Sequence, residues 1–171
     1  LGVAVVAVVA VADDSAEPSA AAGFSAETST STGPRSAVFL HPDGMGVNTW
    51  GAVRLKEVGP DGRLAWDRLP AVAIYVGPMI DGLTASSNGG ATSHAWGMRA
   101  RTDSYGMIGG VPITRSAAGT DGTVMMDAQR AGKTIGIVNS SSVTEPGTGA
   151  FLARVDARED ENEIAAQILA A

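Results

Sequence analysis

The sequence predicts an α/β fold with a largely parallel central sheet. Short apolar runs typical of buried strands alternate along the chain with segments that have helical spacing and helical stop signals. Hydrophobic residues make up 44% and charged residues 18% of the 171 positions, as in a one-domain globular chain rather than a disordered one. The 22 glycines indicate many tight turns and close backbone approaches rather than a helical bundle.

The first half of the predicted domain holds two strands and two helices. Residues 37–40 (AVFL) form a short apolar run that ends at HPDGMG, the pattern of a buried parallel strand before a glycine-containing turn. Residues 46–58 have apolar side chains at helical spacing, and GPDG at 59–62 ends this helix with turn residues. Residues 71–76 (AVAIYV) predict a second strand, and residues 87–99, which are mostly small and lack proline, predict a tightly packed helix.

The second half of the predicted domain continues the alternation. Residues 122–131 (GTVMMDAQRA) predict a helix that Gly132 stops, and residues 134–139 (TIGIVN) predict a third strand. Residues 148–155 and 161–170 predict two further helices. In parallel sheets, ligands bind beyond the carboxyl ends of the strands. The polar residues that follow the strands are therefore the candidates for a functional site.

The N-terminal residues are interpreted as an export signal and a linker. Residues 1–12 (LGVAVVAVVAVA) are an apolar run shorter than the about 20 residues of a membrane-spanning helix, and they suit the apolar core of a secretory signal peptide. A buried valine-rich strand is the alternative. Residues 13–36, rich in Ser, Thr and Ala, predict a flexible linker, because they offer too little apolar surface to offset the entropy of ordering. We therefore expect a domain over residues 37–171, in a periplasmic or secreted protein without a stable membrane span.

Charge and composition exclude several classes of function. The net charge of −6 argues against a broad nucleic-acid-binding surface, so no nucleic-acid partner is expected. The absence of cysteine from the sequence excludes a disulfide scaffold, a cysteine-ligated zinc site, an iron–sulfur cluster and a thiol nucleophile. Because His41 and His94 are the sequence's two histidines, a histidine-rich metal site cannot be built from this chain alone.

Two polar clusters come early in the domain. Asp43 follows the first strand beside glycine, where a carboxylate suits a hard metal ion, and the alternative is an aspartate that caps the next helix. The stretch TASSNGGATSHAWG, residues 84–97, places serine at the start of a glycine-rich helix. Free backbone N–H groups and the positive helix end favour a nucleophile or an anion site there. The alternative is a serine that only caps the helix.

A third polar cluster follows the last predicted strand. Glu145 and Thr148 come soon after that strand, and Arg158 stands ten residues beyond Thr148. Arginine is the side chain best suited to bind phosphate through two parallel hydrogen bonds. The alternative for Arg158 is a solvated surface residue.

Taken together, the three clusters resemble the alkaline phosphatase family. VFLHPDGMG resembles the family's opening strand, which ends in a DGMG-type motif, and Asp43 takes the place of the aspartate that bridges two metal ions. ASSNGGATSHAWGMRA, residues 85–100, resembles the nucleophile helix, in which Ser87, Thr92 and Gly97 keep the family's spacing. Ser87 then falls on the position of the phosphorylated serine, which also contacts metal.

The resemblance continues to the end of the chain. Residues 121–158 resemble the family's next helix, strand and metal loop. Thr148, with a slip of one residue, and Glu145 match the two polar residues that this loop supplies to a magnesium site. Arg158 falls on the arginine that clamps the phosphate.

The sequence departs from the family pattern beside the predicted nucleophile. Ser86 stands where the family usually has an aspartate that helps to orient the arginine, so the Arg158 clamp is expected to be looser. Ser86 is also a rival nucleophile. Pro42 replaces the more usual glycine before Asp43.

The two histidines lie near these motifs. His41 is next to the predicted site, where a capping or packing role is favoured over metal ligation. His94 is seven residues after Ser87 and is expected on the same helix face, two turns along, as a packed core residue.

The resemblance implies a three-layer α/β/α sandwich, of which residues 37–171 would be the N-terminal part. It implies hydrolysis of phosphate monoesters through a phosphoserine, with Zn²⁺ and Mg²⁺ as cofactors, and it leaves a homodimer open. The implied roles are nucleophile for Ser87, substrate binding for Arg158, and metal binding for Asp43, Ser87, Glu145 and Thr148. Most zinc ligands of the family lie in its second half, so this chain alone is expected to bind zinc poorly and to hydrolyse little.

Two other functions remain open at this stage. A phosphodiesterase or a sulfatase-like hydrolase could use the same scaffold. A secreted module that binds phosphate or metal without turnover would belong to a different class.

Overall fold

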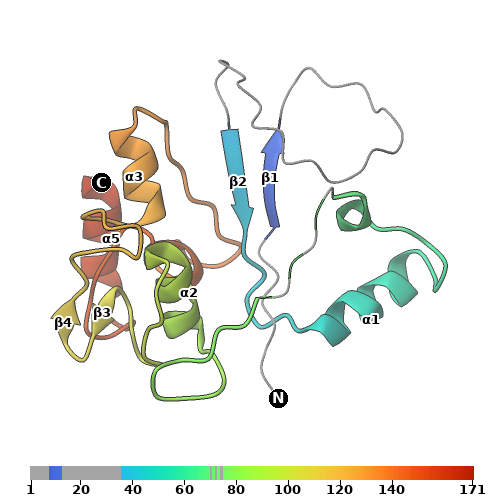
Figure 1. Cartoon of the computed structure of the whole chain (residues 1–171), viewed down its shortest axis with the longest axis horizontal. Coiled ribbons are helices and arrows are strands. Elements are labelled where there is room, and N and C mark those ends of the chain that lie inside the picture. Colours follow the sequence, from blue (N-terminus) through green and yellow to red (C-terminus); the bar gives the residue numbers. More distant parts are fainter. Residues whose placement is uncertain (1–7, 13–35, 70, 72, 74) are drawn as a thin grey trace.

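The computed structural model describes residues 8–12, 36–69, 71, 73 and 75–171 (Figure 1). Its elements follow in the order β1 (Val8–Ala12), β2 (Ser36–Leu40), α1 (Val47–Glu57), a 3-10 helix η1 (Ala65–Arg68), α2 (Ser87–Trp96), β3 (Met107–Ile108), β4 (Val111–Pro112), α3 (Val124–Arg130), α4 (Pro146–Gly149) and α5 (Glu161–Ala170). Figure 1 shows α1 on the opposite side of the β1–β2 pair from α2, α3 and α5.

Strands β1 and β2 pair in antiparallel fashion. Val8 lies opposite Leu40 at one end of the pair, and Ala12 lies opposite Ser36 at the other. Strand β2 confirms a strand over residues 37–40, but it is antiparallel and exposed, with Val38 and Leu40 55% and 61% exposed, so its prediction as a buried parallel strand is corrected. Strand β1 lies in the run for which the sequence offered a valine-rich strand as the alternative to a signal peptide. The remainder of the predicted signal and linker lies outside the described residues, and export stays a prediction.

The predicted largely parallel sheet is not formed among the described residues. Their two sheets are both antiparallel pairs, β1 with β2 and β3 with β4. Residues 134–139 and the described part of 71–76 pair with no strand in this part of the chain, so these two strand predictions are corrected. Val76 and Val138 are 81% and 92% exposed. A parallel strand is stable when both of its faces are covered, and these two segments lack that cover.

The hairpin of β3 and β4 was not anticipated by the sequence reasoning. Met107 pairs with Pro112 and Ile108 with Val111 around a two-residue turn. Gly109 and Gly110 in that turn have φ of 59° and 76°. Positive φ at both central residues is the requirement of the hairpin turn whose twist matches the strands. The dipeptide GG between apolar residues is the signal that could have predicted it.

Helices α1, α2, α3 and α5 all lie within the segments predicted to be helical. Helix α2 ends earlier than predicted because Gly97 takes the left-handed conformation, with φ of 68°. Gly132 has φ of 77° and follows α3 as the predicted stop. None of the helices in the described ranges combines the length and apolar character that a bilayer-crossing helix requires.

The helix predicted over residues 148–155 is placed differently in the structure. Helix α4 covers only Pro146–Gly149, and the chain turns irregularly after it. Pro146 begins this helix because proline lacks the N–H that a first helical residue leaves unpaired. The apolar residues beyond α4 are buried in the core without being helical.

Two buried apolar clusters hold α2 in the middle of the fold. Both combine residues of α2 with residues that follow α4: one consists of Ala91, Tyr105, Ala150, Ala153, Val155 and Ile164, and the other of Ala95, Trp96, Ile113, Phe151 and Leu152. The small residues of α2 permit this close packing. A Cβ at Gly89 would lie 2.6 Å from the sulfur of Met79 and would overlap the carbonyl oxygen of Arg101. This packing fixes the N-terminal end of α2 in space.

Candidate functional site

A cavity of about 590 Å³ lies at the N-terminal end of α2. The loop after β2, the first turn of α2 and the segment before α5 each contribute to its walls. It is lined by His41, Pro42, Asp43, Gly44, Gly46, Ala85, Ser86, Ser87, Asn88, Gly90, Thr102 and Arg158. The structure thus brings three of the predicted site residues, Asp43, Ser87 and Arg158, to one cavity.

Ser87 is the first residue of α2. Its hydroxyl makes no hydrogen bond to any other described residue, and the side chain is half-buried. The first N–H groups of a helix have no partner within the helix, and the helix dipole makes this end positive. A nucleophile placed here lies next to groups that stabilise an anion.

Ser86 is the N-cap residue of α2 and has a different role. Its Oγ accepts a hydrogen bond from the N–H of Gly89 at 3.0 Å and donates one to the carbonyl oxygen of Thr102. This is the capping interaction that serine provides at helix starts. The hydroxyl of Ser86 is therefore engaged both as donor and as acceptor, which favours Ser87 as the reactive serine of the two.

Asp43 lies in the exposed loop between β2 and α1. The N-cap of α1 is Gly46, and no side chain caps that helix, so the alternative of a helix-capping aspartate is wrong. Gly44, next to Asp43, has φ of 68°, which turns the chain sharply after the carboxylate. Asp43 lines the cavity, and its carboxylate makes no hydrogen bond to another residue in the described part of the chain.

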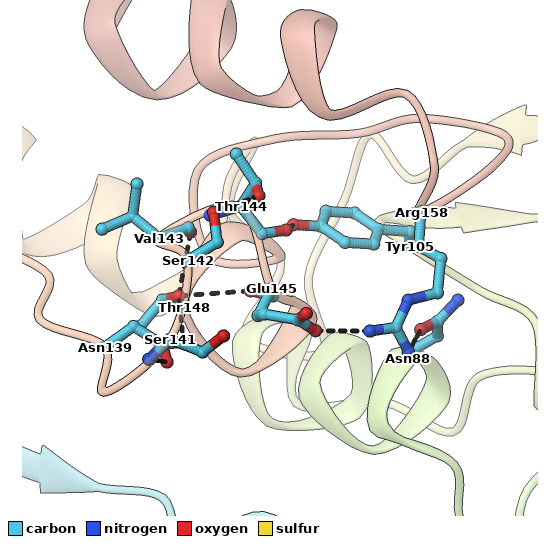
Figure 2. A network of polar contacts seen from close by, with 10 residues as sticks. All are labelled: Asn88, Tyr105, Asn139, Ser141, Ser142, Val143, Thr144, Glu145, Thr148 and Arg158. Atoms are coloured by element: carbon cyan, nitrogen blue, oxygen red, sulfur yellow. Dashed lines mark hydrogen bonds and ion pairs between the residues drawn. The ribbon is translucent and has the colours of Figure 1, made fainter.

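Arg158 is held by two residues from other segments of the chain (Figure 2). Its Nη2 donates to Oε2 of Glu145 in an ion pair, and its Nη1 donates to Oδ1 of Asn88 at 3.5 Å. The side chains of Arg158 and Glu145 are 39% and 40% exposed. The alternative of a freely solvated surface arginine is therefore wrong.

The loop that carries Glu145 and Thr148 is tied together by its own polar groups (Figure 2). Thr148 Oγ1 accepts from Nδ2 of Asn139 at 3.0 Å and lies 2.9 Å from the carbonyl oxygen of Val143, to which it can donate. The buried hydroxyl of Tyr105 donates to the carbonyl oxygen of Thr144 at 2.7 Å. Glu145 therefore contacts a cavity residue, Arg158, without lining the cavity itself. The Thr148 hydroxyl is engaged by Asn139 and by the carbonyl oxygen of Val143 and does not line the cavity.

The sequence matches a known protein family over most of its length. The family model for alkaline phosphatase matches residues 35–170. The chain belongs to the alkaline phosphatase family. This membership confirms the resemblance that the three polar clusters indicated, and the matched range includes every residue of the cavity.

A curated protein named alkaline phosphatase is also similar to this chain. The alkaline phosphatase of Gadus morhua is 30% identical over 141 residues, which cover 75% of this chain and 29% of the relative. The chain therefore spans less than a third of the length of that alkaline phosphatase.

Two contacts of this alkaline phosphatase family site were missed by sequence reasoning. Asn88 was not singled out, although it directly follows the predicted nucleophile as a polar residue at the start of a helix of small residues. Tyr105 was not singled out because its contact with Thr144 joins segments far apart in sequence.

The donors that the sequence predicts for a metal ion are all oxygen atoms. Asp43 and Glu145 offer carboxylates, and Ser87 and Thr148 offer hydroxyls. Among the residues that the structure describes, no group of three or more His, Asp or Glu side chains could hold a metal ion. Of the predicted donors, Asp43 and Ser87 line the cavity, and Mg²⁺, which keeps several waters and uses one or two carboxylates, is the predicted metal that needs few protein donors. A zinc centre takes three or four protein ligands, and binding of Zn²⁺ and of Mg²⁺ both stay predictions.

The two histidines meet in an aromatic cluster beside the cavity. The ring centroid of His94 lies 5.0 Å from that of His41, 5.6 Å from Phe39 and 5.1 Å from Tyr75. Burial lowers the pKa of His41, against the opposing effect of Asp43, and lowers the pKa of His94 to about 4. Both rings are therefore neutral near pH 7, as expected for packed histidines.

Acidification is expected to destabilise the chain through His94. Below its unfolded pKa of 6.5 the unfolded chain takes up a proton that the folded chain, with a pKa of about 4, refuses. The contribution is present above pH 6.5 and is lost as the pH falls toward 4, by about 1–2 kcal/mol after allowance for partial exposure. Urea unfolding at pH 7.5 and 4.5 measures it. His94→Phe should show a smaller loss than the parent chain, and equal losses would contradict the assignment.

Proposed function

We propose that this chain carries the nucleophile and the phosphate-binding arginine of a phosphate monoester hydrolase that works through a phosphoserine on Ser87. One observation supports this above all others. Ser87, whose hydroxyl has no partner among the described residues, lines the same cavity as the guanidinium-bearing Arg158 and the carboxylate of Asp43. Family membership supports the same reaction class.

The cavity offers a phosphoryl group several donors of positive charge. Arg158 keeps N–H groups that Glu145 does not use, since a guanidinium has five donors. The unpaired N–H groups at the start of α2 and the positive end of its dipole add to them. This local arrangement favours an anionic substrate although the chain as a whole carries a net charge of −6.

In the proposed reaction, Ser87 Oγ attacks phosphorus in line with the leaving oxygen. The new P–O bond forms as the bond to the leaving alcohol breaks, while Arg158 holds the equatorial oxygens. Water then cleaves the phosphoserine, which releases phosphate and restores the hydroxyl. A hard divalent cation at Asp43 and Ser87, the two predicted metal residues that line the cavity, would lower the pKa of the serine hydroxyl and neutralise negative charge. Glu145 and Thr148, also predicted to bind metal, would have to give up their contacts with Arg158 and Asn139 to join it.

We also propose that the protein is exported. The apolar run of residues 1–12 and the Ser/Thr-rich stretch that follows support a periplasmic or secreted location. Detection of the protein in periplasmic and culture fractions, with N-terminal sequencing of the exported form, tests this proposal.

Substrate comparison is the experiment that tests the proposed function. The chain, supplied with Mg²⁺, is assayed with p-nitrophenyl phosphate, bis-p-nitrophenyl phosphate and p-nitrophenyl sulfate. We expect slow turnover and a preference of at least about tenfold for the monoester, because its dianion offers three oxygens to Arg158 and to the start of α2.

Each other outcome of this comparison identifies a different function. Faster cleavage of the diester or the sulfate ester indicates the related hydrolases on the same scaffold. Binding of inorganic phosphate with no cleavage and no phosphoserine indicates a module that binds phosphate without turnover.

A further inference from the structure

We propose that Glu145 is the positioning residue of Arg158, whose guanidinium it holds at the cavity wall in the orientation that meets a phosphoryl group on Ser87. This inference rests on the proposed function and adds to it the identity of the residue that orients the arginine. It assigns to Glu145 a contact with the arginine rather than with the substrate.

The contacts of Arg158 identify Glu145 as its charged partner. Nη2 of the arginine is paired with Oε2 of Glu145, and the amide oxygen of Asn88 lies 3.5 Å from Nη1, near the limit for a hydrogen bond. Arg158 lines the cavity, whereas Glu145 is outside its wall. Figure 2 shows Glu145, which directly precedes α4, and Asn88 of α2 directed at the guanidinium. The carboxylate therefore fixes the arginine from behind and leaves room for phosphate in front.

The backbone at Glu145 is itself fixed in place. Its carbonyl oxygen accepts hydrogen bonds from the N–H groups of Thr148 at 3.1 Å and Gly149 at 2.8 Å. The preceding carbonyl, that of Thr144, accepts from Tyr105, whose side chain is 0% exposed. Glu145 is the N-cap residue of α4, yet its side chain makes no capping hydrogen bond and is free to pair with Arg158. A carboxylate on a fixed backbone orients its partner better than one on a loose loop.

Ser86, the residue before the proposed nucleophile, cannot orient the Arg158 guanidinium. Ser86 has no charge, and its hydroxyl is occupied by Gly89 and Thr102. The sequence alone therefore predicts a loosely held arginine. The ion pair with Glu145 supplies from a distant segment the carboxylate that position 86 lacks.

The experiment compares Glu145→Gln and Glu145→Asp with a matched control, Asp67→Asn. Asp67 forms a similar ion pair with Arg54, at 2.5 Å, outside the cavity walls. The first readout is the side-chain ¹⁵N–¹H NMR signal of Arg158, assigned with Arg158→Lys. The second readout is the single-turnover rate of phosphoserine formation from p-nitrophenyl phosphate in the presence of Mg²⁺. Thermal unfolding of each variant reports any loss of folding.

In Glu145→Gln we expect the guanidinium of Arg158 to become mobile, so that its NMR signal no longer shows restrained motion. Phosphoserine formation should slow by about 10–100-fold, the loss that follows when a catalytic group is displaced. Glu145→Asp should recover part of both effects, and Asp67→Asn should change neither by more than about twofold. An Arg158 signal that stays restrained in Glu145→Gln overturns the positioning role. If the Arg158 guanidinium becomes mobile in Glu145→Gln but the parent chain forms no phosphoserine, the positioning role stands and the proposed function fails.

Discussion

Ser87→Ala is expected to abolish phosphoserine formation and to lower hydrolysis of p-nitrophenyl phosphate by at least about 10³-fold, the scale on which loss of a nucleophile is felt. The physical reason is that in the proposed reaction Ser87 supplies the attacking oxygen at the positive end of α2, and alanine leaves the other contacts of the cavity in place. Acid quenching with ³²P-labelled substrate, followed by mass analysis of the peptide that contains residue 87, measures the intermediate directly.

The matched control for this variant is Ser86→Ala. It removes the N-cap hydrogen bond to Gly89 and is expected to lower the free energy of unfolding by about 1 kcal/mol. It should still form phosphoserine, because the Ser87 hydroxyl remains. The reverse pattern, with phosphoserine lost in Ser86→Ala and retained in Ser87→Ala, would show that the two serines exchange roles.

The helices could be predicted from the sequence because their signals are local. Helix α2 follows from a run of small residues with a serine before it and Gly97 after it, and α3 ends before Gly132 as predicted. Each of these signals acts within about one turn of the helix. These helices can therefore be located without knowledge of their tertiary contacts.

The sheet could not be predicted in the same way, because pairing depends on partners far away in the sequence. The apolar run at 134–139 reads as a buried strand, yet Val138 is 92% exposed and the run pairs with no strand among the described residues. Strand β2 was predicted as a strand, but its observed partner is β1 and the pair is antiparallel. A short apolar run indicates a tendency to be buried, but it does not identify the strand or helix that will pack on it.

The candidate site was also predicted only in part: its residues could be named from the sequence, but their partners could not. Asp43, Ser87 and Arg158 were predicted as polar residues that follow strands and that match the motifs of the alkaline phosphatase family, and all three line one cavity. What the sequence could not give is the choice of partner for each polar group. Ser86 donates to Thr102, and Glu145 pairs with Arg158, only because the folded chain brings those segments together. The meeting of His41 with His94 is a further contact of this kind.

The position of the Glu145 loop depends on a close contact between a glycine and a tyrosine. A Cβ at Gly149 would overlap the hydroxyl oxygen of Tyr105 and would lie 3.1 Å from a methyl carbon of Ile164. Both neighbours have side chains that are 0% exposed, so neither can move away into solvent. The same tyrosine hydroxyl binds the carbonyl oxygen of Thr144, which precedes Glu145.

Gly149→Ala is therefore expected to lower the free energy of unfolding by about 2–3 kcal/mol, because overpacking of a rigid core outweighs the gain in helix propensity. Urea unfolding measures this change. Gly51→Ala in α1 is the matched control: nothing lies within 4 Å of its added Cβ, so it should stabilise the chain by up to about 1 kcal/mol. A loss of the same size in both variants would contradict the steric explanation.

A second substitution separates the steric contact from a general intolerance of alanine at this position. Tyr105→Phe removes the hydroxyl that the new Cβ would meet, and by itself should destabilise the chain by about 1–3 kcal/mol because the Thr144 carbonyl loses its buried partner. In the Tyr105→Phe background, Gly149→Ala should cost at least about 1 kcal/mol less than in the parent chain, the coupling expected of residues in direct contact. Additive effects would mean that the hydroxyl does not set the position of α4. A measured coupling would show that Tyr105 determines the position of the segment that carries Glu145. Since Glu145 pairs with Arg158, the tyrosine would then also affect the position of the arginine.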